Sequence, residues 1–227
     1  MEEPIRLNKF LAERLGLSRR QADDAIASGK VLIDGKSAIL GARIDKNNKV
    51  CYNGSIIPYS VGYTYLGLNK PAGYVCSRKR QGDSPTIYEL LPEKYRNLKT
   101  VGRLDKDSSG LILLTNDGDF AFQMTHPGFT KTKIYEVELD HALEPLHQQE
   151  IADFGIKLKD GVSKLGLERL NDDRKSWRVT MSEGRNRQIR RTFGALGYTV
   201  VGLHRTGFGP YQLNDLAPGK FCEVPKI

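Results

Sequence analysis

The chain has 227 residues, a formal net charge of +8 and 39% hydrophobic residues, with an isoelectric point near 9.3. This composition is typical of a globular protein. Its apolar runs are shorter than the ~20 residues that span a bilayer, and the first residues, MEEPIRLNKF, are too acidic for a signal peptide. We therefore expect a cytoplasmic protein without a membrane segment.

The cysteines support that location. Cys51, Cys76 and Cys222 are odd in number, scattered and without a C-x-x-C pair. This pattern predicts a reducing compartment, no disulfide framework and no zinc site. The positive charge favours a polyanionic partner, although surplus lysine can also simply solvate a surface.

Residues 5–50 have the pattern of a small module. The first helix is predicted from apolar residues at helical spacing: Leu7, Phe10, Leu11 and Leu15. Ser18 and Gln21 form a capping-box pattern, which opens a second helix that ends at Gly29. Residues 30–33 predict a strand. Asp34-Gly35 and Asn53-Gly54 predict tight hairpin turns.

Basic residues gather at the ends of these helices: Arg14, Arg19, Arg20 and Lys30. Such a cluster can hold phosphates without reading bases. The alternative is a solvated helix face. Residues 58–64 contain Pro, Gly, Ser and two Tyr, a composition that is typical of a linker.

Beyond residue 64, short strands alternate with short helices, which predicts an α+β chain. The predicted strands are 65–69, 74–77, 111–114, 134–139 and 177–181. The predicted helices are 86–91, 145–154 and 187–196.

Asp105 is the first candidate for chemistry. It lies in VGRLDKDSSGLILLTNDG, residues 101–118, shortly before the apolar run 111–114. That run is flanked by Gly and Asn-Asp-Gly, which indicates a buried strand followed by a turn. An Asp in a short loop is more often a cap or turn residue. Whether Asp105 is structural or catalytic therefore has to be judged from the residues around it.

Two further motifs carry candidate residues. Lys133 and Tyr135 stand in KTKIYEV, where a tyrosine in an alternating strand is usually a core residue. Residues 183–191 read EGRNRQIRR, and a charge run of this kind is usually a solvated face. Arg190, next to Ile189 and three residues before Phe193, lies at the edge of the inward face.

These three motifs together resemble those of the bacterial ribosomal-RNA pseudouridine synthases of the RsuA-type family. Residues 5–50 resemble the S-four-type RNA-binding domain. The resemblance implies a helix-rich RNA-binding domain over residues 1–58, a linker over 59–64 and a catalytic domain over 65–227. That last domain would be a mixed, mainly antiparallel sheet flanked by helices and loops.

The reaction implied by the resemblance is the isomerisation of a uridine in ribosomal RNA to pseudouridine, with no cofactor and no metal. Asp105 would be the catalytic carboxylate, with Tyr135 packed on the target base and Arg190 paired with Asp105. Arg103 would fill the space that the flipped base leaves. The remaining residues expected to contact RNA are Lys133, Arg185, Asn186 and Arg187. Attack by Asp105 on the ribose carbon and abstraction of a ribose proton both stay open.

The resemblance further implies a monomer that acts on ribosomal RNA or a ribosomal precursor particle. The string Tyr74-Val75-Cys76-Ser77 and the absence of a long basic tail favour the small-subunit type. The main alternative is an RNA-binding protein with an inactive synthase domain that acts in ribosome assembly. Two others are a DNA-binding protein and a metal-dependent nuclease that uses Asp105, Asp107 and Asp117.

Overall fold

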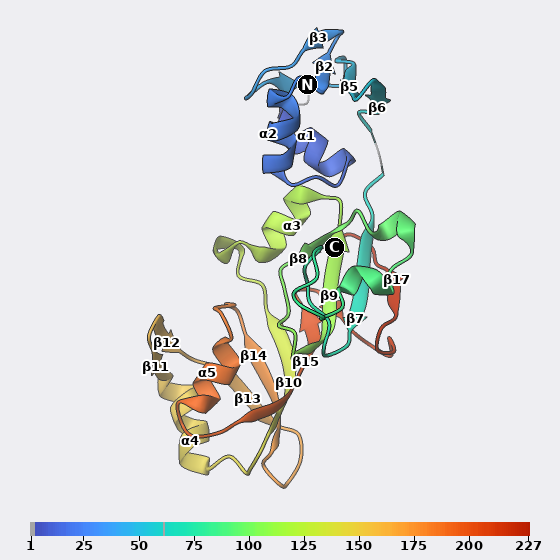
Figure 1. Cartoon of the computed structure of the whole chain (residues 1–227). Helices are drawn as coiled ribbons and strands as arrows, with labels where there is room; N and C mark the ends of the chain where they lie inside the picture. The colour runs from blue at the N-terminus through green and yellow to red at the C-terminus, as the bar shows by residue number, and fades with distance from the viewer. Residues whose placement is uncertain (1–2, 61) are drawn as a thin grey trace.

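The protein is described by a computed structural model that covers residues 3–60 and 62–227, so Val61 of the predicted linker lies outside the described residues. Figure 1 shows a small N-terminal unit above a larger one that contains the C-terminus. Each unit has its own apolar core. One core joins buried residues between Leu7 and Ile57, and two clusters fill the larger unit from Leu66 onward.

The N-terminal unit packs two helices against short strands. Its elements are β1 (Ile5–Arg6), α1 (Leu7–Arg14), α2 (Arg19–Ala27), β2 (Val31–Ile33), β3 (Lys36–Ser37), β4 (Arg43–Ile44), β5 (Val50–Tyr52) and β6 (Ser55–Ile57). The predicted capping box is confirmed, because Ser18 Oγ accepts from the Gln21 amide at 3.1 Å and Gln21 Oε1 from the Ser18 amide at 2.9 Å. Both predicted hairpin turns are confirmed by the β2–β3 and β5–β6 pairs.

The larger unit is built on one sheet in the strand order β13-β14-β10-β15-β9-β7-β17, with β8 beside β9 and β16 beside β15. The bounds are β7 (Tyr65–Lys70), β8 (Lys99–Val101), β9 (Ser109–Thr115), β10 (Lys133–Leu139), β13 (Gly166–Arg169), β14 (Ser176–Met181), β15 (Val200–Phe208), β16 (Tyr211–Gln212) and β17 (Phe221–Glu223). The β9–β15 pair is parallel and the other pairs are antiparallel. The predicted mixed, mainly antiparallel α+β fold is confirmed.

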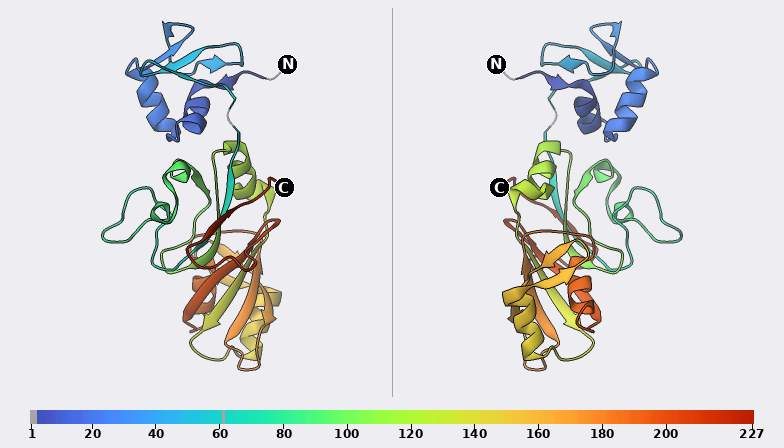
Figure 2. Two further views of the ribbon diagram at one scale, coloured as in Figure 1. Left: turned by 90° about the vertical axis from the view of Figure 1, so that its right-hand side faces the viewer. Right: turned by 90° about the vertical axis from the view of Figure 1, so that its left-hand side faces the viewer.

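Helices and a hairpin flank this sheet. They are α3 (Gly118–Thr125), α4 (Pro145–Gln149), α5 (Gln188–Gly194) and the hairpin of β11 (Ile156–Leu158) with β12 (Gly161–Ser163). The two side views in Figure 2 show α4 and α5 at the end of the molecule that lies furthest from the N-terminal unit. Among the described residues, none of the helices has the length and apolar character needed to cross a membrane.

Gly110 allows the close parallel pairing of β9 with β15, where it lies opposite Arg205. Its φ of 103° lies in the region that favours glycine, and a Cβ there would meet the Arg205 carbonyl oxygen at 2.2 Å. Any larger residue would force the two strands apart. This close pairing brings the segment before β9 beside the middle of β15.

Two local predictions differ from the structure. Residues 74–77 do not form a strand; Val75 makes only an isolated bridge to Thr86, and the Cys76 sulfur accepts from the Leu104 amide at 3.4 Å. The segment follows a loop rather than a partner strand. The helix predicted over 145–154 is α-helical only over α4, and its second half, Glu150–Phe154, is a π-helical turn.

The two units contact each other directly below α1. The Lys9 ammonium lies 2.6 Å from the Asp119 carboxylate on α3, and Lys99 on β8 donates to the Ala12 carbonyl at 2.9 Å. Glu13 lies between them, and its burial raises the pKa of its carboxyl. These contacts fix where the N-terminal unit sits on the larger one.

Candidate active site

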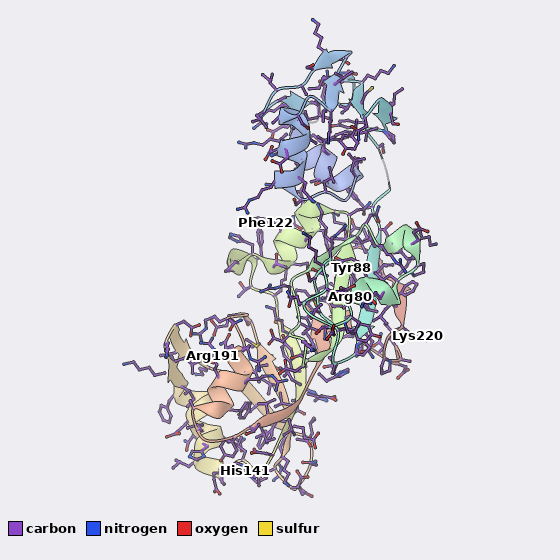
Figure 3. The ribbon with its side chains drawn as sticks, in the orientation of Figure 1. Arg80, Tyr88, Phe122, His141, Arg191 and Lys220 are labelled. Carbon is purple, nitrogen blue, oxygen red and sulfur yellow. The ribbon has the colours of Figure 1, made fainter. Side chains whose placement is uncertain are left out.

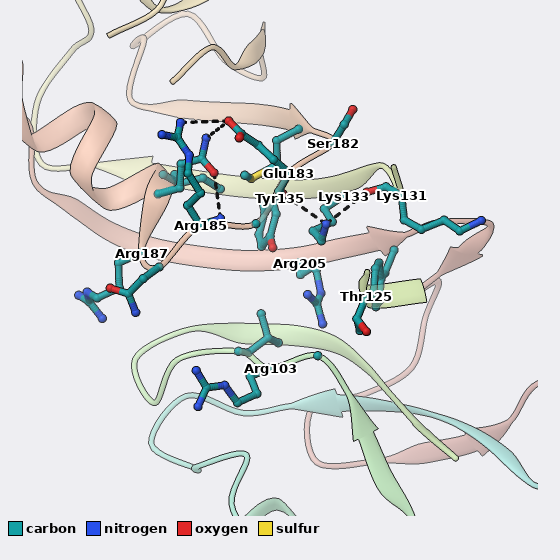
Figure 4. A pocket seen from close by; sticks show the side chains of 18 of the residues that line it. Arg103, Thr125, Lys131, Lys133, Tyr135, Ser182, Glu183, Arg185, Arg187 and Arg205 are labelled. Carbon is teal, nitrogen blue, oxygen red and sulfur yellow. Dashed lines mark hydrogen bonds and ion pairs between the residues drawn. The ribbon is translucent and has the colours of Figure 1, made fainter. Parts of the chain in front are cut away.

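A pocket of about 960 Å³ opens between the segment before β9 and the β10–β14–α5 side of the sheet. Figure 4 shows basic side chains converging on it from both walls. The structure brings together seven of the predicted site residues in its lining: Arg103, Asp105, Lys133, Tyr135, Arg185, Asn186 and Arg187. Arg190 stands behind the lining.

Asp105 belongs to a loop, residues 102–108, that a buried lysine holds in place. Lys70 is fully buried at the end of β7, and its ammonium donates to the Ser108 carbonyl at 2.5 Å and the Pro71 carbonyl at 3.0 Å. Burial lowers the pKa of Lys70, and nearby thiol and carboxyl groups, Asp107 among them, partly oppose that effect. A cation under the loop therefore satisfies backbone carbonyls of the loop and holds the backbone that carries Asp105.

The predicted ion pair between Arg190 and Asp105 differs from what the structure shows. Arg187 is the arginine at Asp105, with Nη1 3.5 Å from Oδ2. Arg190 instead lies 3.3 Å from the Asp107 carboxylate and donates to the Val200 carbonyl at 2.5 Å. The cause is local geometry: Arg187 precedes α5 at a φ of 46° and faces the pocket, whereas Arg190 lies one turn into the helix.

Asp107 is the centre of this arginine group. Arg187 donates to its two carboxylate oxygens, each at 3.1 Å, and Arg190 donates to its backbone carbonyl at 3.1 Å. Burial alone would raise the pKa of Asp107, but the hydrogen bonds from Arg187 and the charge of Arg190 outweigh it and hold that pKa below its ordinary value. Asp107 thus stays ionised and ties the Asp105 loop to α5.

The floor of the pocket carries a second buried cation. Arg205 on β15 is opposite Tyr135 in the strand register and only 2% exposed. Its Nε donates to the Leu111 carbonyl at 2.7 Å, but its buried Nη2 has no hydrogen-bond partner among the described residues. A buried donor of this kind costs free energy until an acceptor reaches it, so the pocket offers a site for a ligand oxygen.

Lys133 lies above the same floor. Burial lowers the pKa of its ammonium, the positive charge of Arg205 lowers it further and Glu183 opposes both. Lys133 donates to the Lys131 and Glu183 carbonyls at 3.3 and 3.2 Å. The pocket is therefore strongly positive at its base, which suits an anionic or carbonyl-rich ligand.

Sequence reasoning missed the roles of Lys70, Asp107 and Arg205. Lys70 opens the turn Lys70-Pro71-Ala72-Gly73, and Asp107 follows Asp105 by two residues. Arg205 stands in the alternating run of β15. A charged residue within or at the end of a strand that is otherwise largely apolar is the signal that could have marked Lys70 and Arg205 for attention, because charged side chains are seldom fully buried.

The remaining predicted RNA contacts fall into two groups. Arg185 is largely engaged within the protein, bonded to Asp160 and to the Val162 carbonyl, and Arg14 donates twice to the Tyr59 carbonyl, at 3.1 and 2.7 Å. By contrast, the exposed residues are Arg19, Arg20, Lys30, Arg103 and Asn186.

The three carboxylates of the nuclease alternative do not gather. Asp117 caps α3, accepting from the Phe120 amide at 3.0 Å, and pairs with Lys226 at 2.8 Å. Within residues 3–60 and 62–227, no group of three His, Cys, Asp or Glu side chains could hold a metal ion. The geometry therefore does not support that reading.

Comparisons with known families agree with this arrangement. Residues 64–195 match the model of the RNA pseudouridylate synthase family, and residues 5–50 match that of the S4 domain. The chain belongs to the RNA pseudouridylate synthase family, a class of isomerases, and carries an S4 domain at its N-terminus.

Individual relatives are similar over nearly the whole chain. The ribosomal small subunit pseudouridine synthase A of Pasteurella multocida is 40% identical, over 96% of this chain and 94% of that protein. The protein of the same name from Escherichia coli K12 is 37% identical, over 96% and 95%. A crystal structure of a pseudouridylate synthase superposes with a TM-score of 0.69 at 35% identity, covering 97% of this chain and 96% of that one.

Proposed function

We propose that this protein isomerises a specific uridine of small-subunit ribosomal RNA to pseudouridine, with Asp105 as the catalytic carboxylate. The relatives named for that activity, similar over nearly the full length, support the substrate. The observation that carries the proposal is the placement of Asp105. It lines a basic pocket in a loop held from below by Lys70 and from the side by α5.

The pocket is suited to isomerisation rather than hydrolysis. Glycoside hydrolysis commonly uses two carboxylates, one of which activates water. Here the neighbouring Asp107 is bound by two guanidinium groups, and Glu183 is engaged by Arg185 and by the Gln188 amide. Both carboxylates are thus held by closer cations than Asp105 is, which meets a single guanidinium among the described residues, at 3.5 Å, so Asp105 is the carboxylate best placed to act on the ribose.

In the proposed mechanism the target uridine leaves its stack, at a cost of a few kcal/mol, and enters the pocket. Asp105 acts on the ribose as the bond from N1 of uracil to C1′ breaks, and the bonding electron pair leaves with N1. The free uracil anion turns and C5 forms a bond to C1′. The proton on C5 is then lost to solvent, N1 takes up a proton, and Asp105 returns to its carboxylate form. Tyr135 packs on the base, and the unpartnered Nη2 of Arg205 donates to one of its carbonyl oxygens. Arg103, exposed at the rim, occupies the space that the base leaves.

The N-terminal unit supplies affinity in this account. Arg19, Arg20 and Lys30 are exposed and contact phosphates of the same RNA. We expect a cytoplasmic monomer that acts on ribosomal RNA or on a precursor particle. Gel filtration with light scattering tests the monomer, because a dimer mass would contradict it.

The direct test replaces Asp105 with Asn, which keeps the shape but removes the carboxylate. We expect pseudouridine formation by purified enzyme to fall below roughly one per cent of wild type, at least 2.7 kcal/mol of barrier, with RNA affinity within a few-fold. Tritium release from C5-labelled RNA measures turnover, and a filter assay measures binding. Asp215→Asn, which changes a surface carboxylate outside the pocket, is the control. Substantial turnover by Asp105→Asn would remove the assignment.

A further inference from the structure

Three aromatic side chains form an exposed cluster at the end of α3 and the turn that follows it. The ring centroids of Phe122 and His126 are 4.6 Å apart, those of Phe122 and Phe129 are 5.9 Å apart, and those of His126 and Phe129 are 6.1 Å apart. Phe122 is 53% exposed and Phe129 is 47% exposed. We call Phe122, His126 and Phe129 the aromatic cluster.

The aromatic cluster is continuous with the rim of the pocket. His126 itself lines the pocket, as do its neighbours Thr125 and Pro127, and Lys131 follows two residues after Phe129. Figure 3 shows Phe122 on α3, directly below the two helices of the N-terminal unit. The cluster therefore lies on the α3 side of the pocket rim, on the element that faces the N-terminal unit.

The cluster is held in shape by the backbone around it. His126 Nδ1 accepts from the Gly128 amide at 3.2 Å, which orients the imidazole ring, and the 3-10 turn Pro127–Phe129 begins with proline. A fixed group of rings loses little conformational freedom when it binds a flat partner. Exposed apolar atoms of this kind otherwise remain a liability on a soluble surface.

We propose that the aromatic cluster is a stacking subsite for an unpaired base of the RNA next to the target uridine. Unpaired RNA bases are commonly bound by stacking on aromatic side chains, and Lys131 is placed to meet a nearby phosphate. The cluster is three rings wide, which matches one or two bases. A stable protein partner would instead need an interface of about 800 Å² on each side, which is more than three half-exposed rings provide. This inference rests on the proposed function, because it needs RNA at the pocket.

The test removes aromaticity but keeps apolar bulk, with the double variant Phe122→Leu, Phe129→Leu. The probe is a decamer of oligouridylate RNA that carries one 2-aminopurine, whose fluorescence falls when it stacks; the uridines on either side can enter the pocket and stack little in the free strand. We expect the variant to bind roughly tenfold more weakly than wild type and to lose most of the quenching. Phe154→Leu is the matched control, because Phe154 is 72% exposed but belongs to the π-helical turn Glu150–Phe154 and not to the aromatic cluster. Thermal melting checks that each variant is folded.

Unchanged affinity and quenching in the double variant would overturn the stacking subsite. So would an equal loss in Phe154→Leu, since that would mean that any exposed phenylalanine matters. A failure of the proposed function would give a different result from a failure of the stacking subsite. Wild-type protein that makes no pseudouridine in ribosomal RNA would refute the catalytic proposal, while a selective loss in the binding assay would still support the subsite.

Discussion

Four arginines at the start of α5 form two ion-pair groups of similar geometry with different consequences. Arg187 and Arg190 bind Asp107, at 3.1 and 3.3 Å, and we call these three residues the loop clamp. Arg185 and Arg191 bind Asp160, at 3.2 and 2.9 Å, and we call these the hairpin clamp. The distances in the two clamps are alike. The clamps differ in the segment of the chain that carries the shared aspartate.

Asp107 stands two residues from Asp105, whereas Asp160 lies in the turn between β11 and β12. The loop clamp therefore restrains the proposed catalytic carboxylate, and the hairpin clamp restrains only the outer wall of the pocket. The importance of an ion pair therefore depends on the segment that it anchors. Matched substitutions in the two clamps can test this.

The largest difference is expected for the two carboxylates. Asp107→Asn leaves Arg187 and Arg190 without their shared anion and loosens the Asp105 loop. We expect the single-turnover rate at saturating enzyme to fall about thirtyfold, which corresponds to about 2 kcal/mol of barrier. Asp160→Asn is the matched control and should change that rate by less than about twofold. Similar losses in both variants would mean that the clamps do not differ in function.

A smaller difference is expected for the two arginines. Arg190 has a side chain only 13% exposed and uses its planar group to reach Asp107 and the Val200 carbonyl together, which an ammonium cannot reproduce. Arg190→Lys should lower the single-turnover rate at least tenfold, about 1.4 kcal/mol. Arg191→Lys keeps a charge beside Asp160 and should leave the rate nearly unchanged. A mild Arg190→Lys would show that the loop clamp needs charge alone.

The exposed basic residues of the N-terminal unit should affect binding rather than chemistry. The double variant Arg19→Ala, Arg20→Ala removes two exposed cations, each of which contributes roughly 0.7 to 0.9 to the slope of log affinity against log salt. We expect a shallower slope with an unchanged single-turnover rate, measured in a salt series. An unchanged slope would place the RNA path elsewhere.

The smallest effect concerns acid stability. Hydrogen bonds from arginine hold the pKa of Asp160 below its ordinary value, and the same holds for Asp107 despite its burial. A carboxyl with a lowered pKa stabilises the fold above its unfolded-state pKa, and this contribution is lost as pH falls through the lowered value. The melting temperature of wild type should therefore drop more steeply than that of Asp160→Asn below about pH 4. Parallel curves would contradict the ionic role of Asp160.

Much of this arrangement could be predicted from the sequence. The capping box at Ser18, the two hairpin turns and the apolar run of β9 follow from local chemistry that acts over a few residues. The grouping of Asp105 with Tyr135 in one pocket also agrees with the motifs.

The pairing of the arginines could not be predicted in this way. Arg187 and Arg190 are three residues apart at the N-terminal end of α5. Which carboxylate each one meets is decided by the close pairing of β9 with β15 at Gly110 and by the position of the Asp105 loop. Likewise, nothing local shows that Lys70 turns under that loop. These contacts join segments that are distant in the sequence, so the spacing of residues within one motif does not predict them.

Asp105 is the residue that we propose carries out pseudouridine formation in small-subunit ribosomal RNA. The most direct measurement is a map of pseudouridine in that RNA from cells that lack this gene, complemented with wild type or with Asp105→Asn. We expect that one pseudouridine disappears in the deletion, returns with wild type and stays absent with the Asn variant. A complete map in the deletion strain, or full restoration by Asp105→Asn, would contradict it.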